Sequence, residues 1–360
     1  MTAIAQEPKI DEARLNAVIG QVVSDFGATA SSALMVLGDK LGLYRAMDGS
    51  GPITSAELAQ RTGTTERYVR DWLVNQAAAG YVDYDPQTQR YNLPHESALA
   101  LARENNPYFV VGGFELFLSM IRAEPEILEA FKSGGGLTWG EHVHGLFVGT
   151  ERFFKPGYLG NLVANWLPAM EGVVPKLQAG ANVADVGCGH GASTIIMAQA
   201  FPASRFWGFD DHAPSIERAK EEAIEAGVAD RVTFAVAEAQ DYPKPEGGYD
   251  LVTFFDCVHD MGDPIGAIKH TSEVLAPGGT AMIVEPMAGE RVEENLNPVG
   301  RIYSAASVML CTPNAVATGN THLGTIATDT ALRNVVQKGG LSRFRRATET
   351  PFNRIFEARL

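Results

Sequence analysis

From Asn182 to Pro286, short β-rich runs alternate with helical runs, and this alternation constrains the fold more than any other feature of the chain. The runs are NVADVG, STIIMAQAF, SRFWGFD, APSIERAKEEAIEAG, RVTFAVAEA, YDLVTFFD, PIGAIKHTSEVL and TAMIVEP. Such alternation predicts an α/β fold, in which helices cover both faces of a parallel sheet. Ligands of these sheets bind beyond the C-terminal ends of the strands, so the residues that end each β-rich run are the candidate site residues.

The N-terminal part of the chain has a helical pattern instead. Apolar residues between 13 and 47 recur at spacings of three and four, which predicts two amphipathic helices. Thr54 begins a capping box, Thr64 or Thr65 opens a further helix, and YVDYD and RYNL follow as a hairpin. Helix, turn, helix and hairpin together predict a winged helix.

The segment 98–175 is helical but interrupted by SGGGLTWGEHVHG and KPGY, which are rich in glycine and aromatic residues. Loops of this kind often form lids or pocket walls. The expected domains are therefore a helical winged-helix domain over 1–97, a helical linker and lid over 98–175, and an α/β domain over 176–360.

Composition argues against several classes of partner. The net charge of -14, without a run of Lys and Arg, disfavours nucleic-acid binding. Neither the three separated cysteines (Cys188, Cys257 and Cys311) nor His142 and His144 have the spacing of a metal site, so no metal is expected. The polar N-terminus and the absence of a long apolar segment predict a cytoplasmic protein without membrane contact.

The loop from Asp185 to Gly191, DVGCGHG, lies between a predicted strand and a predicted helix. Its glycines allow a sharp turn and a close approach of the backbone to a ligand, and the helix amides point at that ligand. Gly187, Gly189 and Ala192 also satisfy the dinucleotide pattern, so a nicotinamide-dependent oxidoreductase stays open at this point.

Carboxylates at the ends of the next two strands narrow the choice of cofactor. Asp210 ends the second strand, where a carboxylate binds the ribose hydroxyls of either nucleoside cofactor. Glu238 and Ala239 end the third strand and offer a carboxylate and a backbone amide to an adenine. This third position favours S-adenosylmethionine.

The motifs DVGCGHG, GFDDH, AEA, FFDCVHDMGDP and VLAPGG, in this order, resemble those of class I S-adenosylmethionine-dependent methyltransferases. The resemblance implies a Rossmann-like, seven-stranded methyltransferase sheet that binds S-adenosylmethionine. It also implies that Gly187, Gly189 and Gly191 wrap the methionine and ribose and that Asp185 supports the loop. By the same resemblance, Asp210 contacts the ribose, Glu238 and Ala239 contact the adenine, and Asp256 contributes to the wall near the methionyl group.

LGLYRAM, the winged-helix segment, ERYVRDWL and the His-Asp of CVHDM resemble the small-molecule O-methyltransferases of bacteria and plants, especially the actinobacterial branch. The resemblance implies a homodimer through the winged-helix domain, a small-molecule acceptor, His259 as the base and Glu285 as the carboxylate that orients it. The chain departs from the pattern at Met261, where the family has Trp, and in NTHLGTIATD, where no acidic residue stands in place of a second supporting Glu.

Two alternatives to this enzyme remain at this level. His259 can be a structural histidine, and the enzyme can then methylate nitrogen or carbon by proximity. The winged helix can belong to a regulator that senses S-adenosylmethionine. Its helix TTERYVRDWLVNQAAAG has Arg67 and Arg70 but also Glu66 and Asp71, a composition that favours packing against a second subunit over contact with phosphates.

Overall fold

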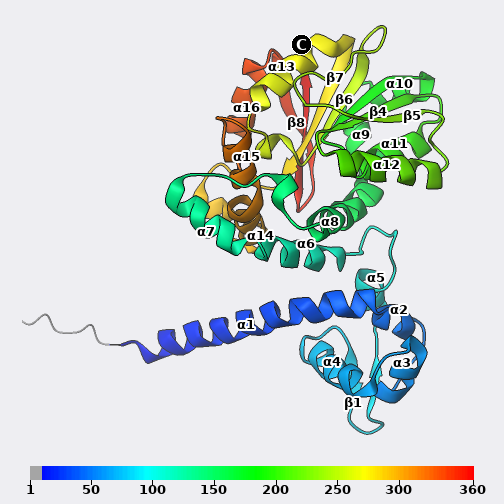
Figure 1. The fold of residues 1–360 in the computed structure, drawn as a ribbon, viewed down its shortest axis with the longest axis vertical. Helices are drawn as coiled ribbons and strands as arrows, with labels where there is room; N and C mark the ends of the chain where they lie inside the picture. The colour runs from blue at the N-terminus through cyan, green and yellow to red at the C-terminus, as the bar shows by residue number, and fades with distance from the viewer. Residues whose placement is uncertain (1–9) are drawn as a thin grey trace, which may run out of the picture. The chain divides into compact units, whose positions relative to one another are not determined.

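The computed structural model describes residues 10–360, which form two compact units, one ending at Glu104 and one spanning Asn105–Leu360 (Figure 1). The units are described separately below. The segment 105–175, expected as part of a separate linker and lid, packs within the second unit. Within residues 10–360, no helix combines the length and the apolar character needed to cross a membrane.

The first unit has the elements of a winged helix. They are α1 (Glu12–Lys40), α2 (Leu43–Met47), α3 (Ser55–Thr62), α4 (Glu66–Ala78), the antiparallel pair β1 (Asp83–Asp85) and β2 (Arg90–Asn92), and α5 (His95–Leu101). The predicted capping box is present, because Thr54 accepts from the Glu57 amide and Glu57 accepts from the Thr54 amide. In the core of the unit, the Tyr44 hydroxyl donates to Gln76 Oε1 over 2.7 Å, and both side chains are buried.

The helix α1 differs from the expectation in length and in exposure. It runs without a break over 29 residues and contains most of both predicted helices, and the short α2 follows it. The apolar residues of its first four turns were expected to mark a buried face, yet they are exposed, Val23 by 63% and Phe26 by 70%. Periodicity identifies the helix but does not identify what covers its apolar face.

The second unit is built on a sheet of seven strands within the described residues, in the order β5-β4-β3-β6-β7-β9-β8. All pairs are parallel except β7 with β9 and β8 with β9. The strands are β3 (Asn182–Val186), β4 (Arg205–Asp210), β5 (Val232–Val236), β6 (Tyr249–Phe255), β7 (Leu275–Pro286), β8 (Arg343–Glu349) and β9 (Asn353–Arg359). The expected seven-stranded sheet is confirmed, and its last strand, β9, runs antiparallel to both of its neighbours.

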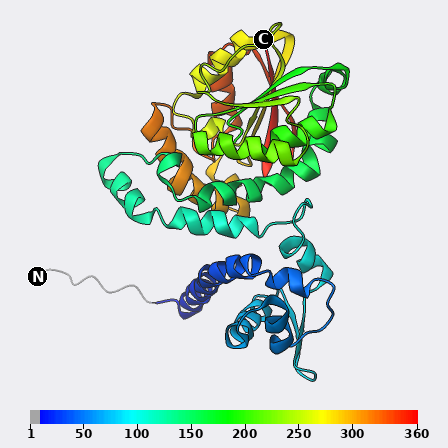
Figure 2. The same ribbon diagram turned by 45° about the vertical axis from the view of Figure 1, so that its right-hand side comes forward.

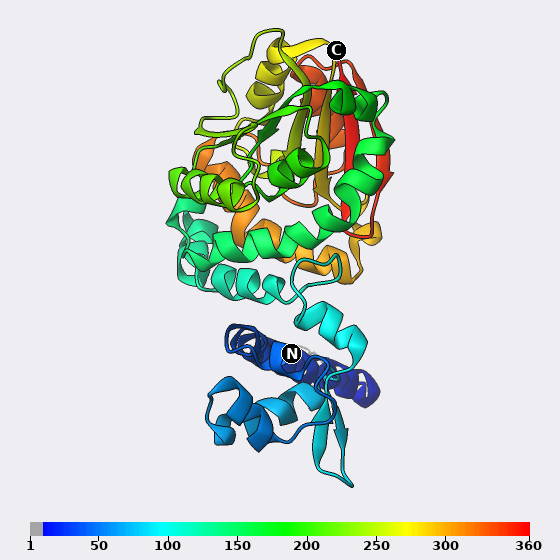
Figure 3. The ribbon, with the colours of Figure 1, turned by 90° about the vertical axis from the view of Figure 1, so that its right-hand side faces the viewer.

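Helices cover both faces of this sheet (Figures 2 and 3). On one face α10 (Val173–Ala179), α11 (Ala192–Ala200) and α12 (Ala213–Glu225) build a core around Phe206 and Met282. On the other face α13 (Pro264–Val274) and α16 (Asp329–Lys338) build a second core around Phe254 and Ile283. Met282 and Ile283 are consecutive in β7, so their side chains point to opposite faces, as the pleat requires.

Further helices complete the second unit. They are α6 (Gly112–Ile121), α7 (Glu124–Ser133), η1 (Trp139–Glu141), α8 (Gly145–Asn161), η2 (Leu162–Trp166), α9 (Leu167–Ala169), η3 (Val258–Asp260), η4 (Val292–Asn295), α14 (Pro298–Ala306), η5 (Ser307–Cys311) and α15 (Thr312–Thr318). The predicted loop at KPGY is wrong, because Pro156 lies inside α8. Gly149 lets α8 cross α6 closely, since a Cβ there would lie 2.3 Å from the Leu116 nitrogen, and this packing outweighs the helix-breaking tendency of proline.

Candidate active site

A cavity of about 220 Å³ opens at the C-terminal ends of β3, β4 and β6, inside the second unit. Its walls are mostly apolar and aromatic, and several polar side chains converge on it, which is the usual character of a small-molecule site. The predicted site residues that line it are Gly187, Gly189, Asp210, Asp256 and His259. Asp185, Gly191, Glu238, Ala239 and Glu285 lie outside this lining.

The three glycines of the loop have different surroundings. All have positive φ, +73° at Gly187, +52° at Gly189 and +79° at Gly191, which explains why glycine is needed. A Cβ added to Gly191 would lie 2.5 Å from Cζ of Phe234, so this glycine is packed against the core. Apart from Gly189 itself and its two neighbours in the chain, no heavy atom of the described residues lies within 4 Å of a Cβ added to Gly189. Of the three glycines, only Gly189 therefore combines open space with a place in the cavity wall.

Two aspartates, Asp185 and Asp210, stabilise the glycine loop through hydrogen bonds. Asp185 is buried and accepts hydrogen bonds from the hydroxyls of Ser193, Thr194 and Thr253. Burial raises its pKa to about 6 despite these bonds. Asp210 accepts from the amides of Gly189 (2.9 Å) and His212 (3.0 Å), and burial raises its pKa to about 6 as well.

The predicted adenine contacts follow β5 directly. Glu238 is exposed and Ala239 is half-buried, and both lie beyond the end of the strand, two and three residues after Val236. The Ala237 amide donates to the carbonyl of Asp210, which joins this segment to the end of β4. The contact of Glu238 and Ala239 with an adenine stays a prediction.

His259 and Glu285 form a buried pair at the ends of β6 and β7. The distance between His259 Nδ1 and Glu285 Oε2 is 2.8 Å, and Glu285 Oε1 also accepts from the Val258 amide. Burial opposes a charge on the imidazole, but the carboxylate of Glu285 outweighs it and holds the pKa of His259 well above its usual value. The pairing fixes the ring and, with the carboxylate on Nδ1, leaves Nε2 to act on a ligand.

Asp260 and Cys311 lie beside this buried imidazole, and the sequence patterns do not show this proximity. The donor atoms of His259, Asp260 and Cys311 lie within 4.8 Å of one another, and Asp260 Oδ2 accepts from Trp139 Nε1 over 2.8 Å. Since the imidazole and this carboxyl already have protein partners, we assign the group no metal ion. Cys311 is 52 residues from His259 in the chain, so only the fold brings them together.

Asp256 has an unusual backbone and a buried carboxyl. Its φ is +52°, although it is not glycine, and its Oδ1 accepts from Asn353 Nδ2 over 2.8 Å. Within the described residues its Oδ2 is buried without a hydrogen-bond partner. Burial, and after it the charge of Glu285, raise the pKa of Asp256 well above the usual range.

The helix α8 roofs the cavity through contacts that the sequence patterns also miss. Glu151 Oε2 lies 3.0 Å from Nδ1 of His190 in the glycine loop, and the ring of Phe147 stacks on His212 with centroids 4.2 Å apart. The same helix contributes Phe153 and Phe154 to the apolar wall, which was expected to include aromatic residues of this region.

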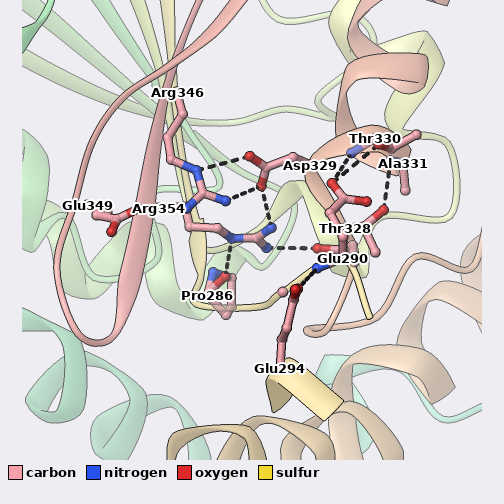
Figure 4. A network of polar contacts seen from close by, with 12 residues as sticks. Pro286, Glu290, Glu294, Thr328, Asp329, Thr330, Ala331, Arg346, Glu349 and Arg354 are labelled. Atoms are coloured by element: carbon pink, nitrogen blue, oxygen red, sulfur yellow. Dashed lines mark hydrogen bonds and ion pairs between the residues drawn. The ribbon is translucent and has the colours of Figure 1, made fainter. Parts of the chain in front are cut away.

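A buried arginine lies behind the pair. Arg354 of β9 donates to the carbonyls of Pro286 and Ala327 and to the carboxylate of Asp329, each over 2.8 Å. Arg346 binds the same carboxylate from β8 (Figure 4). Neither residue was singled out from the sequence, because arginine side chains usually lie at the surface.

Comparison with known proteins gives two domain matches. Residues 29–103 match the Rv2258c-like winged HTH domain, and residues 177–340 match a methyltransferase domain. The 27-O-demethylrifamycin SV methyltransferase of Amycolatopsis mediterranei is 30% identical over 169 residues, which are 45% of this chain and 60% of that protein. The chain spans about half the length of the curated relatives it matches.

Two solved structures share the fold over nearly the whole chain. Human N-acetylserotonin methyltransferase, in complex with S-adenosylmethionine, has a TM-score of 0.69 at 16% identity and covers 99% of each chain. An O-methyltransferase family protein from Burkholderia thailandensis has a TM-score of 0.69 at 16% identity, covering 95% of this chain and 97% of that one. At this identity the likeness concerns the fold.

Proposed function

Since the chain joins a winged helix-turn-helix domain to a methyltransferase domain of the class I fold, we propose that it transfers the methyl group of S-adenosylmethionine to a hydroxyl oxygen of a small molecule. One observation carries the proposal. The imidazole of the buried His259–Glu285 pair lines the same cavity as Gly189 and Asp210, so a base and a nucleoside site share one chamber.

The residues present fit the proposed cofactor. Gly189 leaves open space above the loop, and each oxygen of Asp210 accepts one amide and retains a lone pair for a ribose hydroxyl. When bound, S-adenosylmethionine supplies a methyl group on a positive sulfur, and the protein has to align a nucleophile with it. The remaining contacts, of Asp256 with the methionyl part and of Glu238 and Ala239 with the adenine, belong to the proposal.

His259 would remove the proton of the acceptor hydroxyl. With Glu285 accepting from Nδ1, the neutral imidazole would take that proton on Nε2, and the carboxylate would stabilise the imidazolium that forms. Trp139, Phe147 and the helix α14 would then hold an apolar acceptor, since Trp139 and Phe147 line the cavity together with Ile302 and Tyr303 of α14.

The test has two stages. Calorimetry with S-adenosylhomocysteine should show binding to the wild-type protein and to His259→Gln, and a loss of binding in Asp210→Ala, with NADPH as the negative control. A screen of phenols and alcohols with labelled S-adenosylmethionine should then give a product that His259→Gln forms at least a hundredfold more slowly. Equal turnover by His259→Gln would favour N- or C-methylation by proximity instead.

A regulator that senses S-adenosylmethionine is the second candidate, favoured by the winged-helix match. Both arginines of its α4 are paired within the helix, Arg67 with Asp71 and Arg70 with Glu66, which reduces their use for DNA phosphates. Turnover without retention on DNA would exclude this candidate.

A cytoplasmic homodimer is also part of the proposal. The exposed apolar residues of α1, such as Val23 and Phe26, form a face suited to a second copy of the chain. The free thiols of Cys188, Cys257 and Cys311 suit a reducing compartment. Light scattering should give a dimer mass for the wild-type protein and a monomer mass for Phe26→Glu, whereas a wild-type monomer would contradict the proposal.

A further inference from the structure

Arg354 is a fully buried cation that the proposed reaction does not use directly. In the antiparallel register it stands opposite Glu285, so both side chains lie on the same face of the sheet with Cβ atoms about 5 Å apart. Its guanidinium also donates to the carbonyl of Pro286, the residue after Glu285 (Figure 4). Arg354 is therefore placed to act on Glu285 both by charge and by holding the end of β7.

The other groups around the pair are mostly acidic. Asp256, Cys257, Asp260 and Cys311 face it from β6, η3 and η5, and Asp329 and Arg346 lie on the far side of Arg354. Arg346 is partly exposed, and its partners are Asp329 and Glu349. Arg354 is thus the cation nearest to the carboxylate side of the pair in the described part of the network.

The position of Arg354 matters for the proton affinity of His259, the proposed base. Glu285 raises the proton affinity of His259, and an imidazole that already holds a proton cannot take another from the acceptor. A positive charge on the opposite side of Glu285 acts in the reverse sense, because it disfavours the protonated, positive form of the pair. Burial lowers the pKa of Arg354, while Glu285 and Asp329 oppose that change.

We propose that Arg354 is a positioning residue for the His259–Glu285 pair, because its positive charge opposes that of Glu285 and so limits how far Glu285 raises the proton affinity of His259. Its role in catalysis rests on the proposed function. For two unit charges roughly 6–12 Å apart at an effective dielectric constant of roughly 20, Coulomb's law gives about one to two pKa units, which is the size of shift expected at His259 when the charge of Arg354 is lost.

The experiment follows His259 directly and needs neither donor nor acceptor. Full-length protein is labelled with ¹³C at histidine Cε1, and the His259 signal is identified among the eight histidines by its loss in His259→Gln. Titration by NMR then gives the pKa of His259 in the wild type, Arg354→Met, Arg354→Lys and Arg346→Met. Because no methyl transfer is measured, the titration can be interpreted even if the proposed function is wrong.

We expect Arg354→Met to raise the pKa of His259 by at least one unit. Arg354→Lys, which keeps the charge but loses the planar fork, should stay within 0.3 unit of the wild type, as should the control Arg346→Met, roughly the limit set by screening of exposed charges. If Arg354 were purely structural, Arg354→Lys and Arg354→Met would be equally destabilised, and the pKa of His259 would be the same as in the wild type.

Asp329→Asn provides a second test, which can be used if Arg354→Met does not fold. It removes a negative charge from the same network, so the pKa of His259 should fall rather than rise. An unchanged pKa in the folded Arg354→Met protein, a rise in Asp329→Asn, or a His259 that keeps one protonation state in all variants would each overturn the proposal.

Discussion

Replacing Gly191 by alanine should destabilise the second unit strongly, for two reasons that the structure separates. The backbone there has a φ of +79°, which costs an L-residue about 1–2 kcal/mol. The new Cβ would lie 2.5 Å from Cζ of Phe234 and 3.1 Å from Cβ of Ala219, and overpacking of this kind costs about 1–3 kcal/mol. Phe234 is itself buried in the core, so its ring has little room to move.

The expected loss is therefore about 2–5 kcal/mol, which lowers the melting temperature of a domain of this size by about 5–15 °C. Gly189→Ala is the matched control, because its φ is also positive but the space around its Cβ is open. It should lower the melting temperature by only the backbone share, yet weaken the binding of S-adenosylhomocysteine, since its methyl group enters the cavity. Calorimetric melting and titration measure the two effects separately.

Equal melting temperatures for Gly191→Ala and Gly189→Ala would refute the packing argument. Binding of S-adenosylhomocysteine by Gly189→Ala with wild-type affinity would refute the assignment of the open space to the cofactor.

Three further predictions follow from buried polar groups. The pKa of Asp210 is raised to about 6, and its ionised form accepts ribose hydroxyls, so the affinity for S-adenosylhomocysteine should rise with pH through 6 and level off above it. Calorimetry from pH 5 to 8 should show this rise in the wild type and no such rise in Asp210→Asn. Glu285→Gln should slow turnover about 10²–10⁴-fold at unchanged cofactor affinity, because the imidazolium loses its counter-charge; turnover within threefold of the wild type would contradict this. Tyr44→Phe should destabilise the first unit by about 1–3 kcal/mol in denaturant titration, because Gln76 Oε1 loses its 2.7 Å donor, and an unchanged midpoint would count against it.

The seven strands followed from the resemblance to class I methyltransferases, whereas the alternation of β-rich and helical runs was sufficient to predict a parallel sheet with helices on both faces. It was sufficient because each strand and helix carries its own hydrophobic period, and because the residue that ends a strand is visible in the chain, as with Asp210. The winged helix was predictable for a similar reason, since the cap at Thr54 and the hairpin residues are local signals.

Contacts between distant segments were not predictable in this way. Trp139 with Asp260 and Cys311 with His259 join residues that only the packing of η1 and η5 against η3 brings together. Arg354 looks like an ordinary charged residue in a terminal strand, and its burial depends on carbonyls from two other segments. Pro156 was expected to end a helix, but the close crossing of α6 and α8 keeps the helix intact.

The roof helix α8 has a kinetic consequence. Phe147 and Glu151 contact the nucleoside side of the chamber, while Phe153 and Phe154 of the same helix line its apolar wall. Since both sets of side chains lie on one helix, a movement of α8 away from the sheet would open both sides of the chamber together, and admission of the acceptor and departure of the spent nucleoside would then share one motion. Turnover limited by that motion should slow in proportion to solvent viscosity, whereas turnover limited by methyl transfer should not.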